Sequence, residues 1–294
     1  MEIISLDNFL DTIQSPNLKL DDFWILGNAT SLWKSPDSKF LKLNFHRGPL
    51  LYALIGYLKP KSILEFGTGG GYSTLCMAKA LHDFKIDGKI YTIDRDGNDE
   101  KILRSYQLPN DETPQENEIS NLKIWNSIAP REWIEKIIPL KGYSGTVMKT
   151  PIFNNIDFCY VDGVHTYEGT KHDFLSFLKV ASNSFSILFD DYIARDFYGV
   201  KEFIDKEVNS YFNLQLIKTD VENDCKRFSK FDHEYGMIYS NYKSNIPAIK
   251  NYDEEIVNTF LKKYRNNDNK IRTTRYNLEK KLPFLKNIRF KFWK

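Results

Sequence analysis

The chain has 294 residues, 41% of them hydrophobic and 27% charged, and a formal net charge of +2, which suggests one large or two small globular domains. Its apolar runs fall short of the roughly 18 residues of a membrane span, and its first residues lack the basic start and apolar run of a signal peptide. Three cysteines far apart in the sequence fit free thiols in a reducing cytosol, so we expect a cytoplasmic protein without a disulfide scaffold or a cysteine-based zinc site.

Residues 1–60 are expected to form an N-terminal helical cap. The clearest helix is predicted over Asn44–Leu58, where an amphipathic pattern leads into the first strand of the domain that follows. Within it, the run His46-Arg47-Gly48 is a candidate contact between this segment and the functional site.

Residues 61–241 alternate short β-branched or aromatic runs with helical stretches, a pattern typical of a parallel sheet with crossover helices. The predicted strands are Ser62–Phe66, Lys89–Ile93, Leu122–Trp125, Ile156–Val161, Phe185–Phe189, Leu214–Lys218 and Met237–Tyr239. Two segments interrupt the alternation: Pro109–Ser120 is predicted to be a polar, acidic loop and Pro130–Asn155 a long insert. We therefore expect an α/β domain with a doubly wound, mostly parallel, seven-stranded sheet.

A glycine-rich turn follows the first predicted strand, before a helix that begins near Tyr72. Glycines let the backbone adopt positive φ and approach a ligand closely, and amides at the start of a helix add hydrogen-bond donors. The second predicted strand runs into Asp94, an acid placed to accept both hydrogen bonds of a ribose diol. The G-x-G-x-x-G spacing of dinucleotide-binding folds is not met, because Tyr72 stands at the third glycine position.

Acidic residues also follow two later strands. Asp162 comes after the fourth predicted strand, and Asp190 and Asp191 come after the fifth. Since the carboxyl ends of strands in an open parallel sheet share one edge, these carboxylates can converge there. Converging carboxylates repel one another unless a cation or protons compensate, and hard oxygen ligands favour magnesium, calcium or manganese. His165 lies three residues after Asp162, whereas we place His172 on a helix surface.

The glycine turn resembles the first motif, E/D-x-G-x-G-x-G, of class I S-adenosylmethionine (SAM)-dependent methyltransferases. The matching residues are Glu65, Gly67, Gly69 and Gly71. The later segments resemble the D-G-x-H-x-Y and D-D-Y patterns of the metal-dependent sugar O-methyltransferases of this class, the macrocin O-methyltransferase type. The resemblance covers about residues 61–192 and implies a Rossmann-like methyltransferase fold.

The resemblance also implies a role for each matching residue. SAM would be bound by Glu65, Gly67, Thr68, Gly69, Gly71, Tyr72, Ser73, Asp94, Asn126, Ser127 and Asp162. Asp162, Asp190 and Asp191 would hold a divalent cation such as Mg²⁺, and His165 would be the general base, with Asp162 as a second catalytic residue. Asn126 and Ser127 are placed near the adenine only by their position after the third predicted strand. The expected reaction is O-methylation of a small polyhydroxylated acceptor such as a sugar or glycoside.

Alternatives to this function stay open. An NAD(P)-dependent dehydrogenase or epimerase would use the same kind of sheet, although the missing third glycine counts against it. A non-catalytic nucleotide-binding protein of the same fold is a second alternative, and the intact set of three aspartates and His165 argues against it. Methylation of a different hydroxylated metabolite, including a catechol-like one, is a third.

Residues 242–294 are predicted to form a basic, helical extension. Between Lys262 and Lys294 the chain carries a net charge of +10, whereas the remainder carries −8. Cations interleaved with aromatic residues suit a terminal helix, a subunit contact or an anionic membrane surface, and nucleic acid less well. Peripheral contact with the inner face of the membrane and a homo-oligomer are therefore expectations, alongside the small-molecule acceptor.

Overall fold

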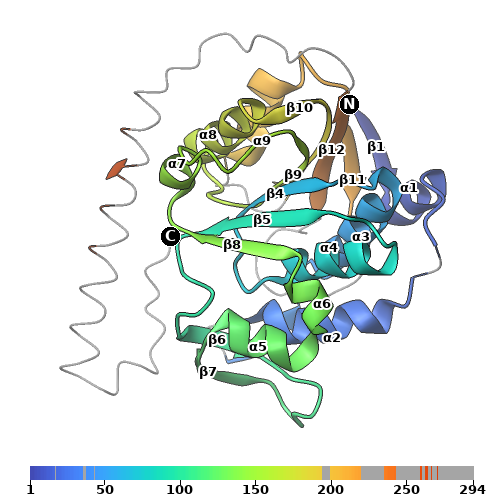
Figure 1. Cartoon of the computed structure of the whole chain (residues 1–294). Coiled ribbons are helices and arrows are strands. Elements are labelled where there is room, and N and C mark those ends of the chain that lie inside the picture. The colour runs from blue at the N-terminus through green and yellow to red at the C-terminus, as the bar shows by residue number, and fades with distance from the viewer. Residues whose placement is uncertain are drawn as a thin grey trace.

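The computed structural model describes residues 1–16, 18–35, 38–42, 44–193, 199–219 and 235–242, with five single residues between 259 and 270 (Figure 1). Apart from Tyr242 and those single residues, the predicted basic extension lies outside the described residues, so its membrane and subunit contacts stay predictions. Among the described helices, none is long and apolar enough to cross a membrane.

A mostly parallel, eight-stranded sheet forms the centre of the fold (Figure 1). In spatial order its strands are β1 (Glu2–Ser5), β11 (Gln215–Lys218), β12 (Gly236–Tyr242), β10 (Ala181–Ile193), β9 (Ile156–Val161), β4 (Ser62–Phe66), β5 (Lys89–Asp94) and β8 (Ile137–Lys141). Of these eight, β12 runs antiparallel to both of its neighbours. The doubly wound α/β fold is thus confirmed, with one strand more than predicted, because β1 pairs in parallel with β11.

Alternating side chains place a hydrophobic core on each face of the main sheet. On β9, Phe158 and Tyr160 join one core, while Cys159 and Val161 join the other. Helices α1 (Leu6–Thr12), α2 (Leu20–Thr30), α3 (Arg47–Leu58), α4 (Tyr72–Asp83) and α6 (Arg131–Ile134) cover the first core. Helices α7 (Ser144–Val147), α8 (Tyr167–Leu178), α9 (Val200–Phe203) and the π-helix η1 (Ile204–Val208) cover the second (Figure 1). The carboxyl ends of the central strands are left at one edge.

The strand predicted over Leu122–Trp125 is wrong, because these residues belong to α5 (Asn121–Ile128). Ser120 caps that helix by accepting a hydrogen bond from the amide of Lys123. A four-residue apolar run does not by itself distinguish a strand from a turn of helix. The strand that pairs with β5 is β8, inside the segment predicted as an insert, and its Pro139 is tolerated because β8 is an edge strand.

A second, antiparallel sheet of four strands stands beside the main one. Its strands are, in order, β3 (Phe40–Lys42), β2 (Leu32–Lys34), β6 (Ile102–Tyr106) and β7 (Gln115–Ile119). The expectation of helices throughout residues 1–60 is therefore wrong for β1, β2 and β3, and the predicted acidic loop contains β7. This small sheet supports the glycine turn, since Arg104 on β6 donates a hydrogen bond to the Gly69 carbonyl at 2.8 Å.

Candidate active site

The glycine turn joins β4 to α4 and contacts the chain just after β9. Gly67, Gly69 and Gly71 have φ angles of 92°, 54° and 94°, in the left-handed region that favours glycine. At Gly67 an added Cβ would stand 2.0 Å from the backbone oxygen of Asp162, so this position also needs a close backbone approach. Gly71 packs against the ring of Trp125 at the start of α4. The shape of the turn therefore depends on its glycines.

Glu65 supports this turn from behind. Its side chain is fully buried and accepts hydrogen bonds from the hydroxyls of Ser73 at 2.5 Å, Thr74 at 2.5 Å and Thr92 at 2.6 Å. Burial raises the pKa of Glu65 to about 7, because the loss of hydration outweighs the three hydroxyl hydrogen bonds. Glu65 thus positions the start of α4 and is not among the residues that line the pocket, and its predicted contact with the cofactor stays a prediction.

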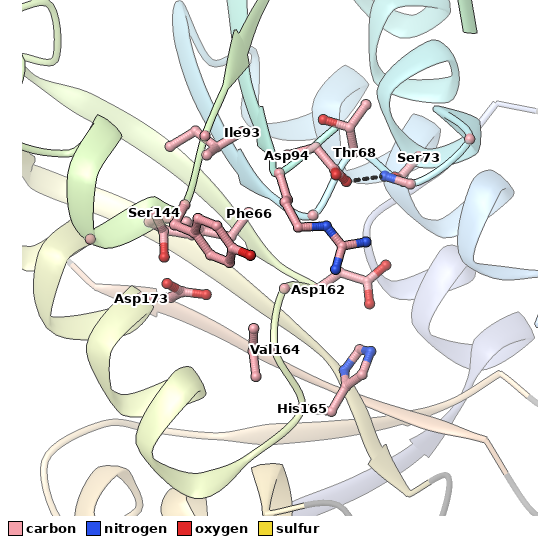
Figure 2. Close-up of a pocket in the computed structure, with 18 of the residues that line it drawn as sticks. Phe66, Thr68, Ser73, Ile93, Asp94, Ser144, Asp162, Val164, His165 and Asp173 are labelled. Atoms are coloured by element: carbon pink, nitrogen blue, oxygen red, sulfur yellow. Dashed lines mark hydrogen bonds between the residues drawn. The ribbon is translucent and has the colours of Figure 1, made fainter. Parts of the chain in front are cut away.

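Asp94, at the end of β5, both faces the pocket and fixes the turn (Figure 2). One of its carboxylate oxygens accepts a hydrogen bond from the Gly69 amide at 2.8 Å, and the other accepts one from the Asp96 amide at 3.0 Å. An acid at the end of the second strand, beside a glycine turn, is the arrangement that binds a ribose in open α/β sheets.

A pocket of about 860 Å³ opens over these strand ends. The predicted site residues that line it are Gly67, Thr68, Gly69, Tyr72, Ser73, Asp94, Asp162 and His165. The size of the pocket and its place at the carboxyl edge of the sheet suit a nucleoside-bearing cofactor.

The adenine contact predicted for Asn126 and Ser127 is corrected by the structure. Both residues are exposed on α5 and neither lines the pocket, because the strand on which their placement depended is a helix. The turn after β8 lines the pocket instead, through Gly142, Tyr143, Ser144, Gly145 and Thr146. Gly142 and Gly145, which follow the apolar run of β8, were the sequence signal for this turn. Pro139 within that run concealed the strand.

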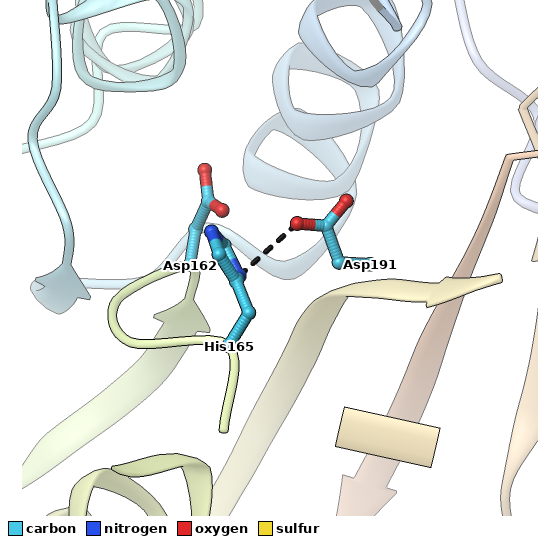
Figure 3. Close-up of side chains that lie close together, drawn as sticks. All are labelled: Asp162, His165 and Asp191. Atoms are coloured by element: carbon cyan, nitrogen blue, oxygen red, sulfur yellow. Dashed lines mark ion pairs between the residues drawn. The ribbon is translucent and has the colours of Figure 1, made fainter. Parts of the chain in front are cut away.

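Asp162, His165 and Asp191 form a compact group beside the pocket (Figure 3). One potential ligand atom from each lies within 4.8 Å of the others, and Nδ1 of His165 is 3.0 Å from Oδ2 of Asp191. Asp162 and His165 come from the loop after β9, and Asp191 from the neighbouring strand β10. Carboxylate oxygens and an imidazole at this spacing can hold a divalent cation.

Asp190 lies outside this group and is directed into the protein. It is buried, with 4% of its surface exposed, and its two oxygens accept hydrogen bonds from the Tyr160 hydroxyl at 2.6 Å and from the Asn44 amide at 3.3 Å. The Tyr160 hydroxyl is also 3.3 Å from Asp162. The structure thus connects Asp190 to the predicted cation site through Tyr160 and does not bring its carboxylate into the group.

The two neighbouring aspartates diverge because β10 is irregular at this point. Its register against β12 shifts between Phe189 and Ile193, and Asp191 adopts a φ of 57°. A bulge of this kind turns one side chain away from the direction that strand alternation would give it. Sequence alone predicts the two acids but not their separation.

Negative charge at this edge is only partly balanced. The pKa of Asp162 is raised well above its ordinary value, because the carboxyl loses hydration and lies near Asp190 and Asp191. Arg47 supplies a positive charge: burial lowers its pKa, but the nearby Tyr160, Asp190 and Asp162 outweigh burial and raise it. Three aspartates near one arginine leave a surplus of negative charge, so these residues fit a divalent cation.

His172, predicted on a helix surface, is buried instead, with 3% of its surface exposed. Its Nδ1 lies 3.5 Å from Asp173, the next residue of α8. Asp173 lines the pocket and lies against Gly163 in the loop after β9. Asp173, which also fits the family pattern as a supporting residue, is thus a further residue of the pocket lining.

A family described as a methyltransferase domain matches residues 64–192 of the chain. The match spans the glycine turn, Asp94 and the whole Asp162–His165–Asp191 group. The match covers less than half of the chain and supports a methyltransferase domain over this segment. The match favours a methyltransferase over the dehydrogenase alternative.

Solved structures resemble the chain at low sequence identity. Cofactor-bound Rv0187 from MTB has a TM-score of 0.51 and 16% identity, covering 82% of this chain and 97% of that chain. Two further structures are similar. The O-methyltransferase TomG from Streptomyces achromogenes in complex with SAM has a TM-score of 0.48 and 17% identity, covering 81% of this chain and 96% of that chain. The O-methyltransferase from Bacillus cereus in complex with SAH has a TM-score of 0.49 and 17% identity, covering 81% of this chain and 97% of that chain. The likeness to Rv0187 shows only that the two chains share a fold. No curated protein matches the chain in sequence.

Proposed function

We propose that this protein is a SAM-dependent O-methyltransferase that acts on a hydroxyl of a small polyhydroxylated acceptor, such as a sugar or glycoside, with the help of a divalent cation. The observation that carries the proposal is the Asp162–His165–Asp191 group beside the pocket that the glycine turn and Asp94 also border. A base and a set of cation ligands thus adjoin the place where a methyl donor fits.

His165 is proposed as the general base. When bound, SAM supplies the methyl group from its sulfonium, so that the carbon–sulfur bond breaks as the acceptor oxygen forms its bond to carbon. The proton of the attacking hydroxyl needs an acceptor. Because Nδ1 of His165 faces Asp191, the tautomer with hydrogen on Nδ1 is favoured and Nε2 is left to take that proton. The same carboxylate then stabilises the protonated imidazole.

Asp162 and Asp191 are proposed as the cation ligands, with Asp190 behind them. A carboxylate has two oxygens, so Asp191 can face both His165 and a cation. When bound, a divalent cation supplies positive charge that lowers the pKa of the acceptor hydroxyl and orients it. Support for this part of the proposal comes from the oxygen donors themselves and from the raised pKa of Asp162.

The experiment is an acceptor screen with SAM and Mg²⁺, using glycosides, catechols and matched amine and thiol analogues. Product formation is read as release of S-adenosylhomocysteine together with a mass gain of one methyl group. The proposal predicts transfer to hydroxyl acceptors only, and loss of transfer in His165→Ala. Transfer to an amine or thiol analogue in preference to its hydroxyl counterpart would contradict O-methylation and leave the methyltransferase domain itself unchallenged.

A further inference from the structure

Arg47 stands where α3 begins and lines the same pocket as the glycine turn. Its Nη2 donates a hydrogen bond to the Ser31 hydroxyl at 2.8 Å, and its guanidinium carbon is 5.3 Å from the centre of the Tyr72 ring. Tyr72 is itself fixed, since its hydroxyl donates a hydrogen bond to the Phe45 carbonyl at 2.5 Å. The guanidinium is therefore held in place from two sides, at the wall of the pocket.

The position of Arg47 along the pocket is defined by its neighbours. The end of α2 packs on the glycine turn so closely that a Cβ at Gly70 would stand 1.9 Å from the Thr30 carbonyl. Thr30, Ser31 and Arg47 line this end of the pocket, whereas Asp94 and Ser144 belong to β5 and the turn after β8. The arginine thus lies at the α2–α3 end, away from the strand that carries the ribose-binding acid.

This arrangement matches the two ends of SAM, and the inference rests on the proposed use of that cofactor. The molecule has a nucleoside at one end and an amino acid, with a free carboxylate, at the other. If Asp94 holds the ribose, the amino-acid end extends along the glycine turn toward Ser31 and Arg47. A guanidinium has five N–H donors in a planar fork that suits a carboxylate, so Arg47 can keep its hydrogen bonds to the Ser31 hydroxyl and to the Asn44 carbonyl (3.4 Å) and still bind one.

We propose that Arg47 binds the carboxylate of the methionyl end of SAM and makes the pocket selective for it. The competing explanation is that Arg47 acts only as a counter-charge for Asp162 and Asp190, with no contact to the ligand. The two differ in one respect: a counter-charge stabilises the pocket for every ligand alike, whereas a carboxylate receptor discriminates between ligands with and without that group.

The test compares SAM with decarboxylated SAM, which lacks only the carboxylate, by titration calorimetry on the full chain without an acceptor. We expect the wild type to bind SAM roughly 10- to 100-fold more tightly, the scale of a lost charge-assisted hydrogen bond. In Arg47→Met this ratio should fall to about threefold or less, and Arg47→Lys should retain part of it because it keeps the charge without the fork. Thermal unfolding checks that each variant is folded.

Lys149→Met is the matched control, because Lys149 is another cation of the pocket lining, located just after α7. It should keep the wild-type ratio. Equal affinity of the wild type for the two ligands would overturn the proposal, as would a high ratio that survives in Arg47→Met. If the wild type binds neither ligand, the cofactor assignment fails too, so the two failures are distinguishable. If Arg47→Met does not fold, Arg47→Gln gives the same comparison.

Discussion

Nδ1 of His165 lies 3.0 Å from Oδ2 of Asp191, although the two residues belong to different strand–loop units. His165 follows β9 and Asp191 stands in the irregular part of the parallel neighbour β10. The pair therefore joins the loop after β9 to strand β10. The contact with Asp191 favours one orientation of the imidazole, which a general base needs because its proton-accepting nitrogen must face the acceptor.

Replacing His165 by alanine should lower kcat by about 10²-fold, the usual scale for losing a general base, while SAM affinity stays near that of the wild type. Steady-state kinetics and a binding titration measure the two effects separately. His82→Gln is the control, because His82 lies on α4 and does not line the pocket. Full turnover in His165→Ala would exclude the assigned role.

Asp162→Asn and Asp191→Asn should each weaken the binding of Mn²⁺, used as a spectroscopic probe for Mg²⁺, by about tenfold or more. Asp96→Asn should not, since Asp96 lies beside Arg95 and outside the group. The same Mn²⁺ titration on Asp190→Asn shows whether Asp190 is a cation ligand or only supports the ligands. Because Asp190 accepts hydrogen bonds from Tyr160 and Asn44, we expect a smaller loss of Mn²⁺ affinity. EDTA should abolish turnover and added Mg²⁺ should restore it.

Unchanged turnover in EDTA would show that the carboxylate group acts without a cation. That result would leave the pairing of His165 with Asp191 intact, because the pair needs no metal to form.

The buried Glu65 should make stability depend on pH in a defined direction. Its pKa is about 7 in the folded chain, above the ordinary value of 4.5, so the folded state binds more protons than the unfolded state between these values. The free energy of unfolding should therefore fall as pH rises from about 4.5 to about 7. Denaturant titrations of the wild type and Glu65→Gln over this range measure the difference. A variant with the same pH slope as the wild type would contradict the raised pKa.

Two glycine substitutions separate backbone conformation from steric contact. Gly69→Ala should cost about 1–2 kcal/mol of unfolding free energy, since φ is 54° but an added Cβ meets nothing within 4 Å. Gly67→Ala should cost clearly more, because its Cβ would meet the Asp162 carbonyl oxygen at 2.0 Å. Chemical denaturation checks both. Equal costs would mean that the turn relaxes away from β9.

The sequence predicted the central strands and the glycine turn well, because long-range contacts there agree with local patterns. Strands β4, β5 and β9 are short apolar runs that end in acids or glycine, and they lie where predicted. The predictions failed where local signals were ambiguous. Leu122–Trp125 is too short to show a period, and Pro139 concealed the edge strand β8.

The sequence predicted which residues lie at the candidate site better than it predicted their arrangement. Asp162, His165 and Asp94 lie at the pocket as expected. The divergence of Asp190 from Asp191 could not be predicted, because it arises from a bulge in β10. Arg47 was predicted as a candidate contact with the site and does line the pocket, but its exact place depends on how α2 and α3 pack against the turn, which no local pattern encodes.

Use of SAM by this protein is tested by calorimetric titration of SAM into the wild-type chain, with NADH in a parallel cell. We expect one SAM site, no heat from NADH, and a loss of SAM affinity of about tenfold or more in Asp94→Ala. Absence of SAM binding by the wild type, or tighter binding of NADH, would contradict the account.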